Sequence, residues 1–395
     1  MNDDSDPTER GLATEAVHAG GPERAPGSPV VRPVVHSSTY FWSDPGDGAE
    51  PIYTRLGNNP NQRSVAAKVA ALEGTEDALA LASGMAAIAM TILSAASRGD
   101  HVVASRSLYG ATHLLLKEEL PRRGISATLV DPHDADAWAA ATTPRTRVVL
   151  LELPTNPTLR VFDLGPPRRA ARSVGALLAA DVTFATPVNL RAAEHGVDAV
   201  LHSATKYLGG HSDLIAGVVA GSAELVAGVA AKMKLYGASI DPHAAWLLER
   251  GLRTLPTRVE RHNVSAMALA RWFGTVPTVR RVLHPGLPDH PDHALARALM
   301  DGFGGMVSIV LEGGAEAADT FCRSLRLASV APSLGGVETL VSQPRHTSHA
   351  DLSSGELEAA GIEPGFVRIS VGLEDLRDLK ADFAAAAAAA ATPPP

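Results

Sequence analysis

Residues 199–210 read Ala-Val-Leu-His-Ser-Ala-Thr-Lys-Tyr-Leu-Gly-Gly. The apolar run Ala199–His202 is followed by small and hydroxyl side chains, by Lys206 and by a pair of glycines. A short apolar run that ends in turn-forming residues is typical of a buried strand. We therefore expect the amine of Lys206 at the carboxyl end of a buried strand, where the chain turns.

The same alternation continues on both sides of this stretch, through residues 53–250. Short apolar runs alternate with helical patterns, which is typical of a parallel sheet covered by helices on both faces. Ligands bind to such sheets beyond the carboxyl ends of the strands. The strands that we predict are Asp77–Ala82, His101–Ser105, Ser126–Asp131, Val148–Leu153, Ala176–Val182, Ala199–His202 and Ala216–Ala220.

The pattern changes before and after this region. Residues 1–52 are rich in Pro, Gly and Ser, and we interpret them as an extended N-terminal arm. Residues 251–395 favour a smaller C-terminal α/β domain that ends in a frayed tail. Its predicted elements are helices Arg261–Phe273, Pro291–Met300 and Ala384–Ala391 and strands Met306–Leu311 and Val367–Val371. The sequence thus predicts an α/β protein with an arm, a large domain of residues 53–250 and a smaller domain.

The composition limits the class of protein. The chain has 395 residues, a formal net charge of −8 and one cysteine, Cys322. It shows no basic stripe for a phosphate backbone, so we expect no nucleic-acid partner. One cysteine excludes an intramolecular disulfide and fits a reducing compartment. Residues 1–10 lack a signal-peptide pattern, and no apolar run approaches the ~18 residues of a membrane span. We expect a soluble cytoplasmic protein without a membrane partner.

Lys206 differs from the other lysines of the chain. The remaining five lie in amphipathic stretches, which predicts exposure to solvent. A lysine that is desolvated at a strand end loses proton affinity and becomes a usable nucleophile. Ser203 and Thr205 can donate hydrogen bonds to a phosphate beside it. The alternative is a structural lysine whose aliphatic stem packs on apolar surface.

Three further strand ends carry groups that suit a planar, phosphorylated ligand. Asp181 ends an apolar strand and precedes Thr183, and a buried carboxylate there can pair with a protonated pyridine nitrogen. Ser83-Gly84-Met85 lies between a strand and a helix, which predicts an anion site. Tyr109 follows the second predicted strand and can stack on a ring. Each has an ordinary alternative, namely a turn aspartate, a helix N-cap and a packed tyrosine. Their joint occurrence indicates that Lys206 carries pyridoxal phosphate (PLP).

Five stretches connect the chain with a known family. They are Ser83-Gly84-Met85-Ala86-Ala87, Pro154-Thr155-Asn156-Pro157-Thr158, Asp181-Val182-Thr183-Phe184-Ala185-Thr186-Pro187, His202-Ser203-Ala204-Thr205-Lys206-Tyr207-Leu208-Gly209-Gly210-His211 and Val367-Arg368-Ile369-Ser370-Val371-Gly372. In these stretches the chain resembles the Cys/Met metabolism PLP-dependent enzymes, the trans-sulfuration group. This group includes cystathionine γ-synthases, cystathionine lyases and methionine γ-lyases. The resemblance runs from Tyr53 to about Phe383 and implies the type I, aspartate-aminotransferase-like fold of PLP-dependent transferases.

The resemblance also implies individual roles. Lys206 forms the internal aldimine and then shuttles protons, and Tyr109 stacks on the ring as a second catalytic candidate. Arg368 grips the α-carboxylate of the substrate, a bidentate task that suits guanidinium, with Ser333 nearby. The other cofactor-binding candidates are Ser83, Gly84, Met85, Ser203 and Thr205 at the phosphate and Asn156, Asp181 and Thr183 at the ring, and Asn156 also borders the substrate.

The family further implies an active site that two subunits share. In its members, residues at the positions of Tyr53 and Arg55 reach the phosphate of a neighbouring subunit. A homodimer is then required, and a dimer of dimers is expected. The segment Gly57-Asn58-Asn59-Pro60-Asn61 departs here from the family's usual Gly-Asn-Pro-Thr.

The choice of reaction depends on a few positions near the substrate. Cystathionine-handling members often have an acidic residue before the Tyr53 position and Glu before the Ser333 position, whereas this chain has Ile52 and Pro332. Pro332, together with the stretches Thr183–Pro187 and Ser203–Gly210, resembles plant-type cystathionine γ-synthases more. Methionine γ-lyases usually carry Cys where this chain has Ala111. We predict γ-replacement on an O-acylated homoserine with cysteine. The alternatives are elimination by a cystathionine γ- or β-lyase and a methionine γ-lyase-like activity.

Other classes of protein fit parts of the pattern. A nicotinamide enzyme needs a Gly-x-Gly-x-x-Gly turn after a strand, and the sequence has none. A metal hydrolase would use Asp289–His293 or His346–His349, but these polar stretches lack a helical two-histidine spacing, so we predict loops without a metal. A non-catalytic binding protein would not need Lys206, Asp181 and Arg368 together.

Overall fold

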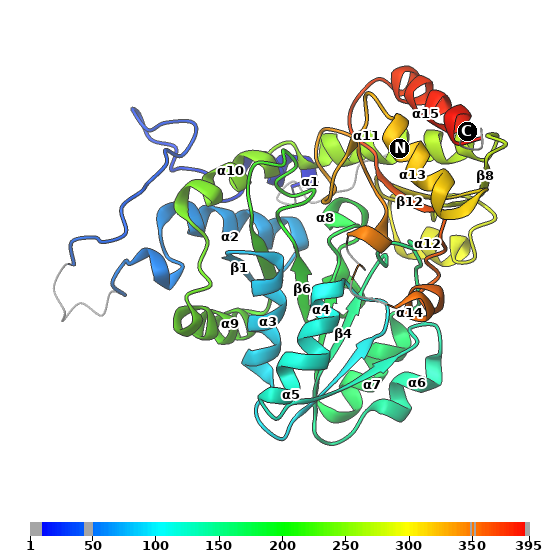
Figure 1. The fold of residues 1–395 in the computed structure, drawn as a ribbon. Coiled ribbons are helices and arrows are strands. Elements are labelled where there is room, and N and C mark those ends of the chain that lie inside the picture. The colour runs from blue at the N-terminus through cyan, green and yellow to red at the C-terminus, as the bar shows by residue number, and fades with distance from the viewer. Residues whose placement is uncertain (1–9, 43–49, 348–349, 351–352, 392–395) are drawn as a thin grey trace, which may run out of the picture.

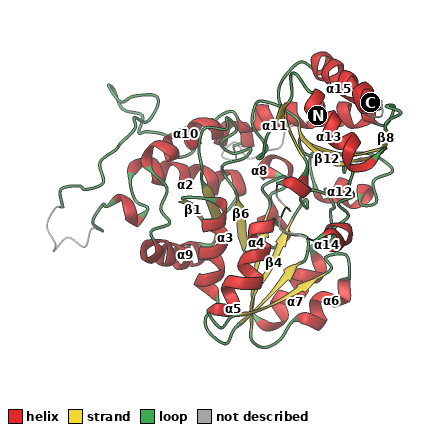
Figure 2. Ribbon diagram, in the orientation of Figure 1, coloured by secondary structure: helices red, strands yellow, loops and turns green. Residues whose placement is uncertain are grey.

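The computed structural model describes residues 10–42, 50–347, 350 and 353–391, and these residues form two β-sheets. Figure 1 shows the larger sheet in the body of the molecule and the smaller one beside α13 (Gly314–Ser324) and α15 (Leu376–Ala390) at the upper right. Helices lie on both sides of the larger sheet (Figure 2). The blue segment between α1 (Leu12–His18) and α2 (Pro60–Glu73) extends away from this body (Figure 1).

The larger sheet has seven strands in the order β1-β7-β6-β5-β4-β2-β3. Neighbours from β6 to β3 run parallel, whereas β7 is antiparallel to both β1 and β6. The prediction of an α/β fold with a mostly parallel sheet is confirmed. The strands are β1 (Asp77–Leu81), β2 (His101–Ser105), β3 (Ser126–Val130), β4 (Thr146–Glu152), β5 (Leu177–Asp181), β6 (Ala199–His202) and β7 (Gly217–Gly221).

Alternate residues of these strands pack into two separate hydrophobic cores. One face packs against α2 (Pro60–Glu73), α7 (Gly165–Val174) and α10 (Pro242–Leu252), and the other against α3 (Gly84–Ala95) and α9 (Ala223–Tyr236). Because both faces are buried, the strands are apolar at nearly every position. This explains why continuous apolar runs located the strands in the sequence.

The smaller sheet has the strand order β10-β11-β12-β9-β8. Its strands are β8 (Val279–Leu283), β9 (Met306–Leu311), β10 (Ser329–Val330), β11 (Leu340–Ser342) and β12 (Phe366–Ser370). Helices α11 (Leu255–Phe273), α13 (Gly314–Ser324) and α15 (Leu376–Ala390) share a third core with it. The domain boundaries at residues 53 and 251 stay predictions.

Shorter helices connect these layers. They are α1 (Leu12–His18), η1 (Thr54–Leu56), α4 (Gly110–Leu114), η2 (Leu115–Glu119), α5 (Leu120–Arg122), α6 (Ala135–Ala141), α8 (Thr186–Asn189), η3 (Ala192–His195), α12 (His293–Leu299), η4 (Pro344–His346) and α14 (Ser354–Ala359). Among the described residues, no helix combines the length and the hydrophobicity that a bilayer crossing requires.

Helix α1 changes the interpretation of the N-terminal arm and of one lysine. The arm is not extended throughout, because α1 packs on α2 and α11. Lys68 of α2 is fully buried, and its Nζ donates a 2.8 Å hydrogen bond to the carbonyl of Ala16. Burial lowers the pKa of Lys68 to about 8. The prediction that this lysine is solvated was wrong, because the pattern of α2 alone does not reveal that α1 covers it.

Candidate active site

The carboxyl ends of four neighbouring parallel strands bring the predicted residues together. Strands β6, β5, β4 and β2 are adjacent in the sheet. Asp181 ends β5, and the segments that follow β6, β4 and β2 carry Lys206, Asn156 and Tyr109 respectively. Parallel strands that end at one edge place the following loops side by side. Residues that are distant in the sequence therefore surround one site.

Lys206 lies in the interior of this site. Its Nζ donates a 2.8 Å hydrogen bond to Oγ of Ser333. Burial, and next the charge of Arg368, lower the pKa of Lys206 to about 8. Ser333 has φ of 90°, a left-handed conformation that a non-glycine residue rarely adopts. The structure thus places a partly desolvated amine against a serine that is held in a strained conformation.

The lowered pKa predicts how the cofactor-free protein reacts with the aldehyde of PLP. Attack requires the neutral amine, so the rate of covalent attachment should rise about tenfold per pH unit below pH 8 and level off above it. An unperturbed lysine, for which N-acetyl-lysine is the reference, would keep gaining reactivity up to about pH 10. The measurement is the growth of visible absorbance after mixing, at a series of pH values. A protein rate that still climbs between pH 9 and 10 contradicts the assignment.

Asp181 and Thr183 form the second part of the site. Both the backbone N–H and the hydroxyl of Thr183 donate to Oδ1 of Asp181, at 3.0 and 2.5 Å. The hydroxyl of Thr183 in turn accepts a 2.8 Å bond from the backbone N–H of Ser203. Burial raises the pKa of Asp181, which the bonds from Thr183 oppose. A buried carboxylate in this state gains from a cationic partner, and a pyridinium nitrogen is one.

The N-terminus of α3 forms the third part. Ser83 caps this helix, since its Oγ accepts a 3.1 Å bond from the N–H of Ala86. The N–H groups of the first turn precede any intrahelical partner and are available to an anion. The chain passes close by at Gly84, where an added Cβ would lie 2.7 Å from Cβ of Ser203. Thr205 lies next to Lys206, but its hydroxyl already bonds both backbone groups of Ala216.

Gly217 is expected to be essential for the anion site at the N-terminus of α3. A Cβ at this position would lie 2.0 Å from the backbone oxygen of Ser83 and 2.8 Å from the nitrogen of Gly84. Gly217→Ala must therefore displace the cap of α3, and we expect roughly tenfold or greater loss of PLP affinity, measured by absorbance titration. The control is Gly228→Ala in α9, whose Cβ would meet only Cβ of Ser94 at 3.9 Å. Equal affinity in both variants would contradict this role.

Arg368 reaches the site from β12 of the smaller sheet. It is buried, and it donates to Oδ1 of Asn156 and to the carbonyl of Ser333, both at 2.9 Å. Its Nε is buried without a hydrogen-bond partner among the described residues. Burial lowers the pKa of Arg368 to about 10. A buried guanidinium with an unsatisfied donor is suited to an anionic ligand such as a carboxylate.

Glu152 is a part of the site that the sequence interpretation missed. It ends β4 opposite Asp181 of β5. Its carboxylate accepts bonds from the backbone N–H groups of Tyr109 and Asn156. Burial, and next the charge of Asp181, raise the pKa of Glu152 to about 8. The available signal was an acidic residue at the end of an apolar run, the same signal that pointed to Asp181.

Tyr53 and Arg55 lie outside the site of their own chain. Arg55 donates a 2.7 Å bond to the carbonyl of Lys234 and lies over the ring of Tyr53. The segment that carries them lies at the outer edge of the molecule (Figure 1).

The segment Gly57-Asn58-Asn59-Pro60-Asn61, which departs from the family pattern, is held in place by hydrogen bonds of its asparagines. Asn58 accepts from the N–H of Tyr53, and Asn59 and Gln62 form a capping box at the start of α2.

The histidine-rich stretches have structural partners. Asp292 pairs with Arg160 and accepts a 2.9 Å bond from the N–H of Val161, so it supports the loop that follows Asn156. Within the described ranges, no three His, Cys, Asp or Glu side chains gather as metal ligands. In the second stretch, residues 348 and 349 lie outside the described residues.

The site combines a buried amine, a buried carboxylate, a helix N-terminus and a buried guanidinium. These groups suit the aldehyde, the ring nitrogen and the phosphate of PLP and the carboxylate of an amino-acid substrate, and this combination is typical of a PLP-dependent enzyme. The chain belongs to the family of Cys/Met metabolism PLP-dependent enzymes, whose sequence profile matches residues 13–388. It is a PLP enzyme of sulfur amino-acid metabolism, as the sequence predicted.

Similar proteins cover almost the whole chain. O-succinylhomoserine sulfhydrylase of Pseudomonas aeruginosa is 39% identical over 96% of this chain and 96% of its own. L-methionine gamma-lyase of Fusobacterium nucleatum subsp. polymorphum is 40% identical over 94% of this chain and 96% of its own. The structure of cystathionine gamma synthase from Xanthomonas oryzae pv. oryzae, in complex with aminoacrylate and cysteine, superposes with a TM-score of 0.93 at 36% identity, covering 97% of this chain and 99% of that chain. These comparisons establish the family and the trans-sulfuration class and leave the individual reaction to be inferred.

Proposed function

We propose that this enzyme catalyses γ-replacement on an O-acylated homoserine, with cysteine as the incoming thiol. The bound PLP supplies a ring that withdraws electrons from the substrate Cα. Arg368 and Asn156 bind the substrate α-carboxylate, and the carboxylate of Asp181 would stabilise the positive charge on the pyridine nitrogen. Lys206 takes the proton from Cα and returns it further along the side chain, since its lowered pKa lets the amine act as a base near neutral pH.

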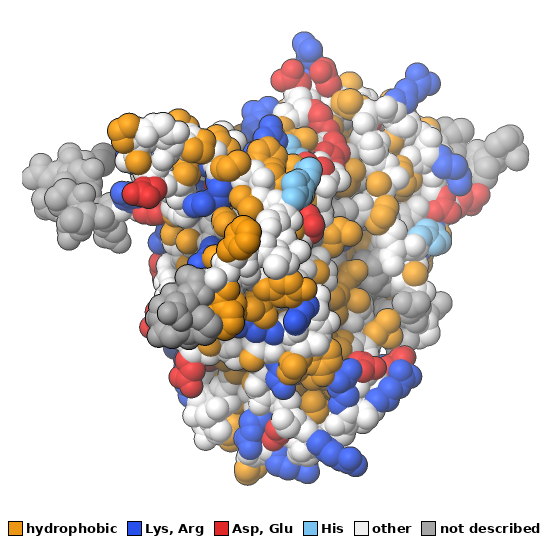
Figure 3. Space-filling view, turned by 90° about the vertical axis from the view of Figure 1, so that its left-hand side faces the viewer, with side chains coloured by type: hydrophobic (Ala, Val, Ile, Leu, Met, Phe, Trp, Pro, Cys, Tyr) orange, Lys and Arg blue, Asp and Glu red, His pale blue; other side chains and the backbone are white. Residues whose placement is uncertain are grey.

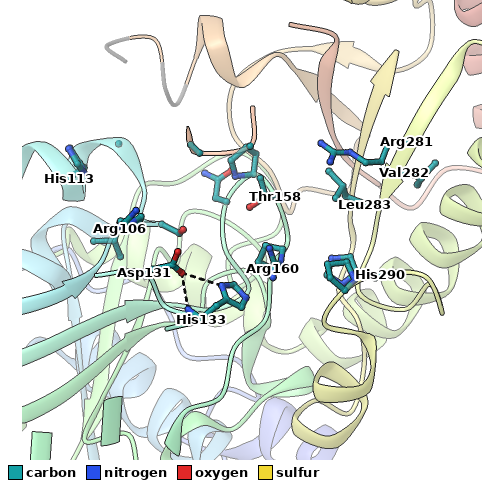
Figure 4. Close-up of a pocket in the computed structure, with 18 of the residues that line it drawn as sticks. Arg106, His113, Asp131, His133, Thr158, Arg160, Arg281, Val282, Leu283 and His290 are labelled. Atoms are coloured by element: carbon teal, nitrogen blue, oxygen red, sulfur yellow. Dashed lines mark hydrogen bonds and ion pairs between the residues drawn. The ribbon is translucent and has the colours of Figure 1, made fainter. Parts of the chain in front are cut away.

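The observation that supports this choice of substrate is a cavity that Asn156 lines, next to the site of Lys206 and Arg368, which do not line it. It has a volume of about 630 Å³ and lies between the two sheets. Arg106 and Asp131 line it from the side of the larger sheet and Arg281 from the side of the smaller one (Figure 4). The cations of its wall are Arg106, Lys117, Arg160 and Arg281, against the acids Asp131 and Asp289.

The four cations differ in their ion pairs. Arg160 pairs with Asp292 and Arg281 with Glu363. Arg106 and Lys117 have no ion-pair partner within the part of the chain that the structure describes. Four cations against two acids among the lining residues favour an anionic acyl group, such as a succinyl ester, over an uncharged thioether. This supports an acylated homoserine ahead of methionine as the substrate.

Elimination is the second candidate reaction. The relatives include a methionine gamma-lyase that is as similar to this chain as the sulfhydrylase. Overall identity therefore favours neither reaction. Against the lyases stand Pro332, Ile52 and Ala111, which differ from the residues that the resemblance associates with lyase pockets.

A direct competition between reactions tests the proposal. Purified enzyme with PLP is supplied with O-succinyl- or O-acetylhomoserine plus cysteine, and separately with cystathionine or methionine alone. We expect cystathionine and the free acid in the first mixture and little keto acid in the second. Fast release of keto acid from cystathionine, without condensation, would reassign the enzyme as a lyase.

We also propose that the working enzyme is a homodimer or a dimer of dimers. The arm exposes large apolar side chains, among them Val30, Phe41 and Trp42, of which Val30 is 88% exposed. Hydrophobic side chains are numerous on the face that carries the arm (Figure 3). A second copy that covers this face would bring Tyr53 and Arg55 to its partner's site. Light scattering of the purified protein in solution tests this, and a monomer with full activity would exclude it. A cytoplasmic location stays a prediction.

A further inference from the structure

Glu152 lies at the centre of the carboxyl edge of the larger sheet. It ends β4, which β5 flanks on one side and β2 on the other. Its direct partner across the first pair is Asp181. The loop after β2 brings Tyr109 to it from the other side. Glu152 is only 6% exposed, so its carboxylate depends on protein groups for its hydrogen bonds.

Each carboxylate oxygen of Glu152 accepts from a different loop. Oε2 accepts from the backbone N–H of Tyr109 at 2.7 Å, and Oε1 accepts from the backbone N–H of Asn156 at 3.0 Å. Tyr109 is 41% exposed, so packing does little to hold its ring. Asn156 in turn accepts a bond from Arg368. One side chain thus anchors the backbone of both residues.

We propose that Glu152 is a positioning residue that holds Tyr109 and Asn156 in place for the PLP ring. The inference rests on the proposed function and on the positions of Tyr109 and Asn156 at the ring that the family resemblance implies. Glu152 itself touches neither cofactor nor substrate in this account. It acts by fixing the distance between two loops that approach the ring from different strands.

The side chain of a glutamate is suited to joining these two loops. An ionised carboxylate is an acceptor at both oxygens, so it satisfies two N–H donors at once. A glutamine offers one oxygen and turns an NH2 group toward the other donor. An aspartate keeps the charge but is one methylene shorter, so it cannot reach both loops without movement. Burial and the charge of Asp181 raise the pKa of Glu152 to about 8, while the two backbone N–H groups and Arg368 favour its charged form.

The test compares Glu152→Gln with the wild-type chain. Without cofactor, amide hydrogen exchange should become at least about tenfold faster at Tyr109 or Asn156, since a buried bond is lost. With cofactor, the Kd for PLP should rise about tenfold, and the visible circular dichroism of the bound ring should change. In turnover, kcat should fall more than KM rises, because Arg368 still binds the substrate carboxylate even where Asn156 shifts.

The matched control is Glu249→Gln. Glu249 is 2% exposed, bonds Arg253 and lies away from the site. It should lower the melting temperature but leave PLP affinity, ring dichroism and both amides unchanged. If Glu152→Gln does not fold, Glu152→Asp takes its place with the same expected direction. Unchanged exchange and unchanged affinity in the folded variant overturn the inference. Because exchange is measured without cofactor, that result stands even where the substrate assay reassigns the reaction.

Discussion

Replacing Lys206 by alanine is expected to lower kcat by roughly 10³-fold or more, because the chain loses both its covalent anchor and its base. The structure shows no other amine in hydrogen-bond contact with Ser333 among the described residues. The variant should bind PLP reversibly, without the absorbance of the lysine adduct. Borohydride should fix the cofactor on the wild-type chain and leave the variant unlabelled, which mass spectrometry of the tryptic peptide detects.

The matched control for this prediction is Lys380→Ala. Lys380 lies on α15, remote from the carboxyl edge of the larger sheet. It should keep wild-type turnover and borohydride labelling at position 206. Full turnover by Lys206→Ala would remove the basis of the proposed chemistry, and labelling at a different lysine would move the site.

The larger sheet was predictable because its strands are buried on both faces. Every predicted strand from Asp77 to Ala220 overlaps an observed one. The antiparallel direction of β7 was not predicted, since strand direction depends on the connection and leaves no mark on an apolar run. Strands β8, β10 and β11 were not predicted, because β10 and β11 are short and two consecutive exposed arginines interrupt the apolar residues of β8.

The site was predictable where its residues follow strands. Lys206 and Asp181 stand at strand ends, and the parallel sheet brings such ends together. Arg368 lies inside β12 of the other sheet, so only the family resemblance pointed to it. Glu152 and the burial of Lys68 depend on contacts between distant segments. Neither a strand pattern nor a helix pattern contains the partner that arrives from elsewhere in the chain.

Replacing Arg368 by lysine is expected to lower kcat/KM by about 10²-fold, mainly through KM. The guanidinium spans Asn156 and Ser333 and still has Nε free for a ligand among the described residues. An ammonium is a point charge on a flexible stem and cannot make these contacts at once. The α-carboxylate is bound equally in the ground and transition states, so its loss appears in KM. Steady-state kinetics over a wide substrate range, with PLP saturating, separate the two constants.

Arg377→Lys is the control, because this side chain is 88% exposed on α15 and should leave both constants unchanged. A fall in kcat without a rise in KM for Arg368→Lys would mean that Arg368 acts on the reacting groups. Its contact with the carbonyl of Ser333 offers a physical route for that result. Since Ser333 also accepts the bond from Lys206, a shift of Ser333 would move the amine. Whether the change appears in KM or in kcat therefore distinguishes two roles of Arg368, namely binding the substrate carboxylate and supporting Lys206 through Ser333.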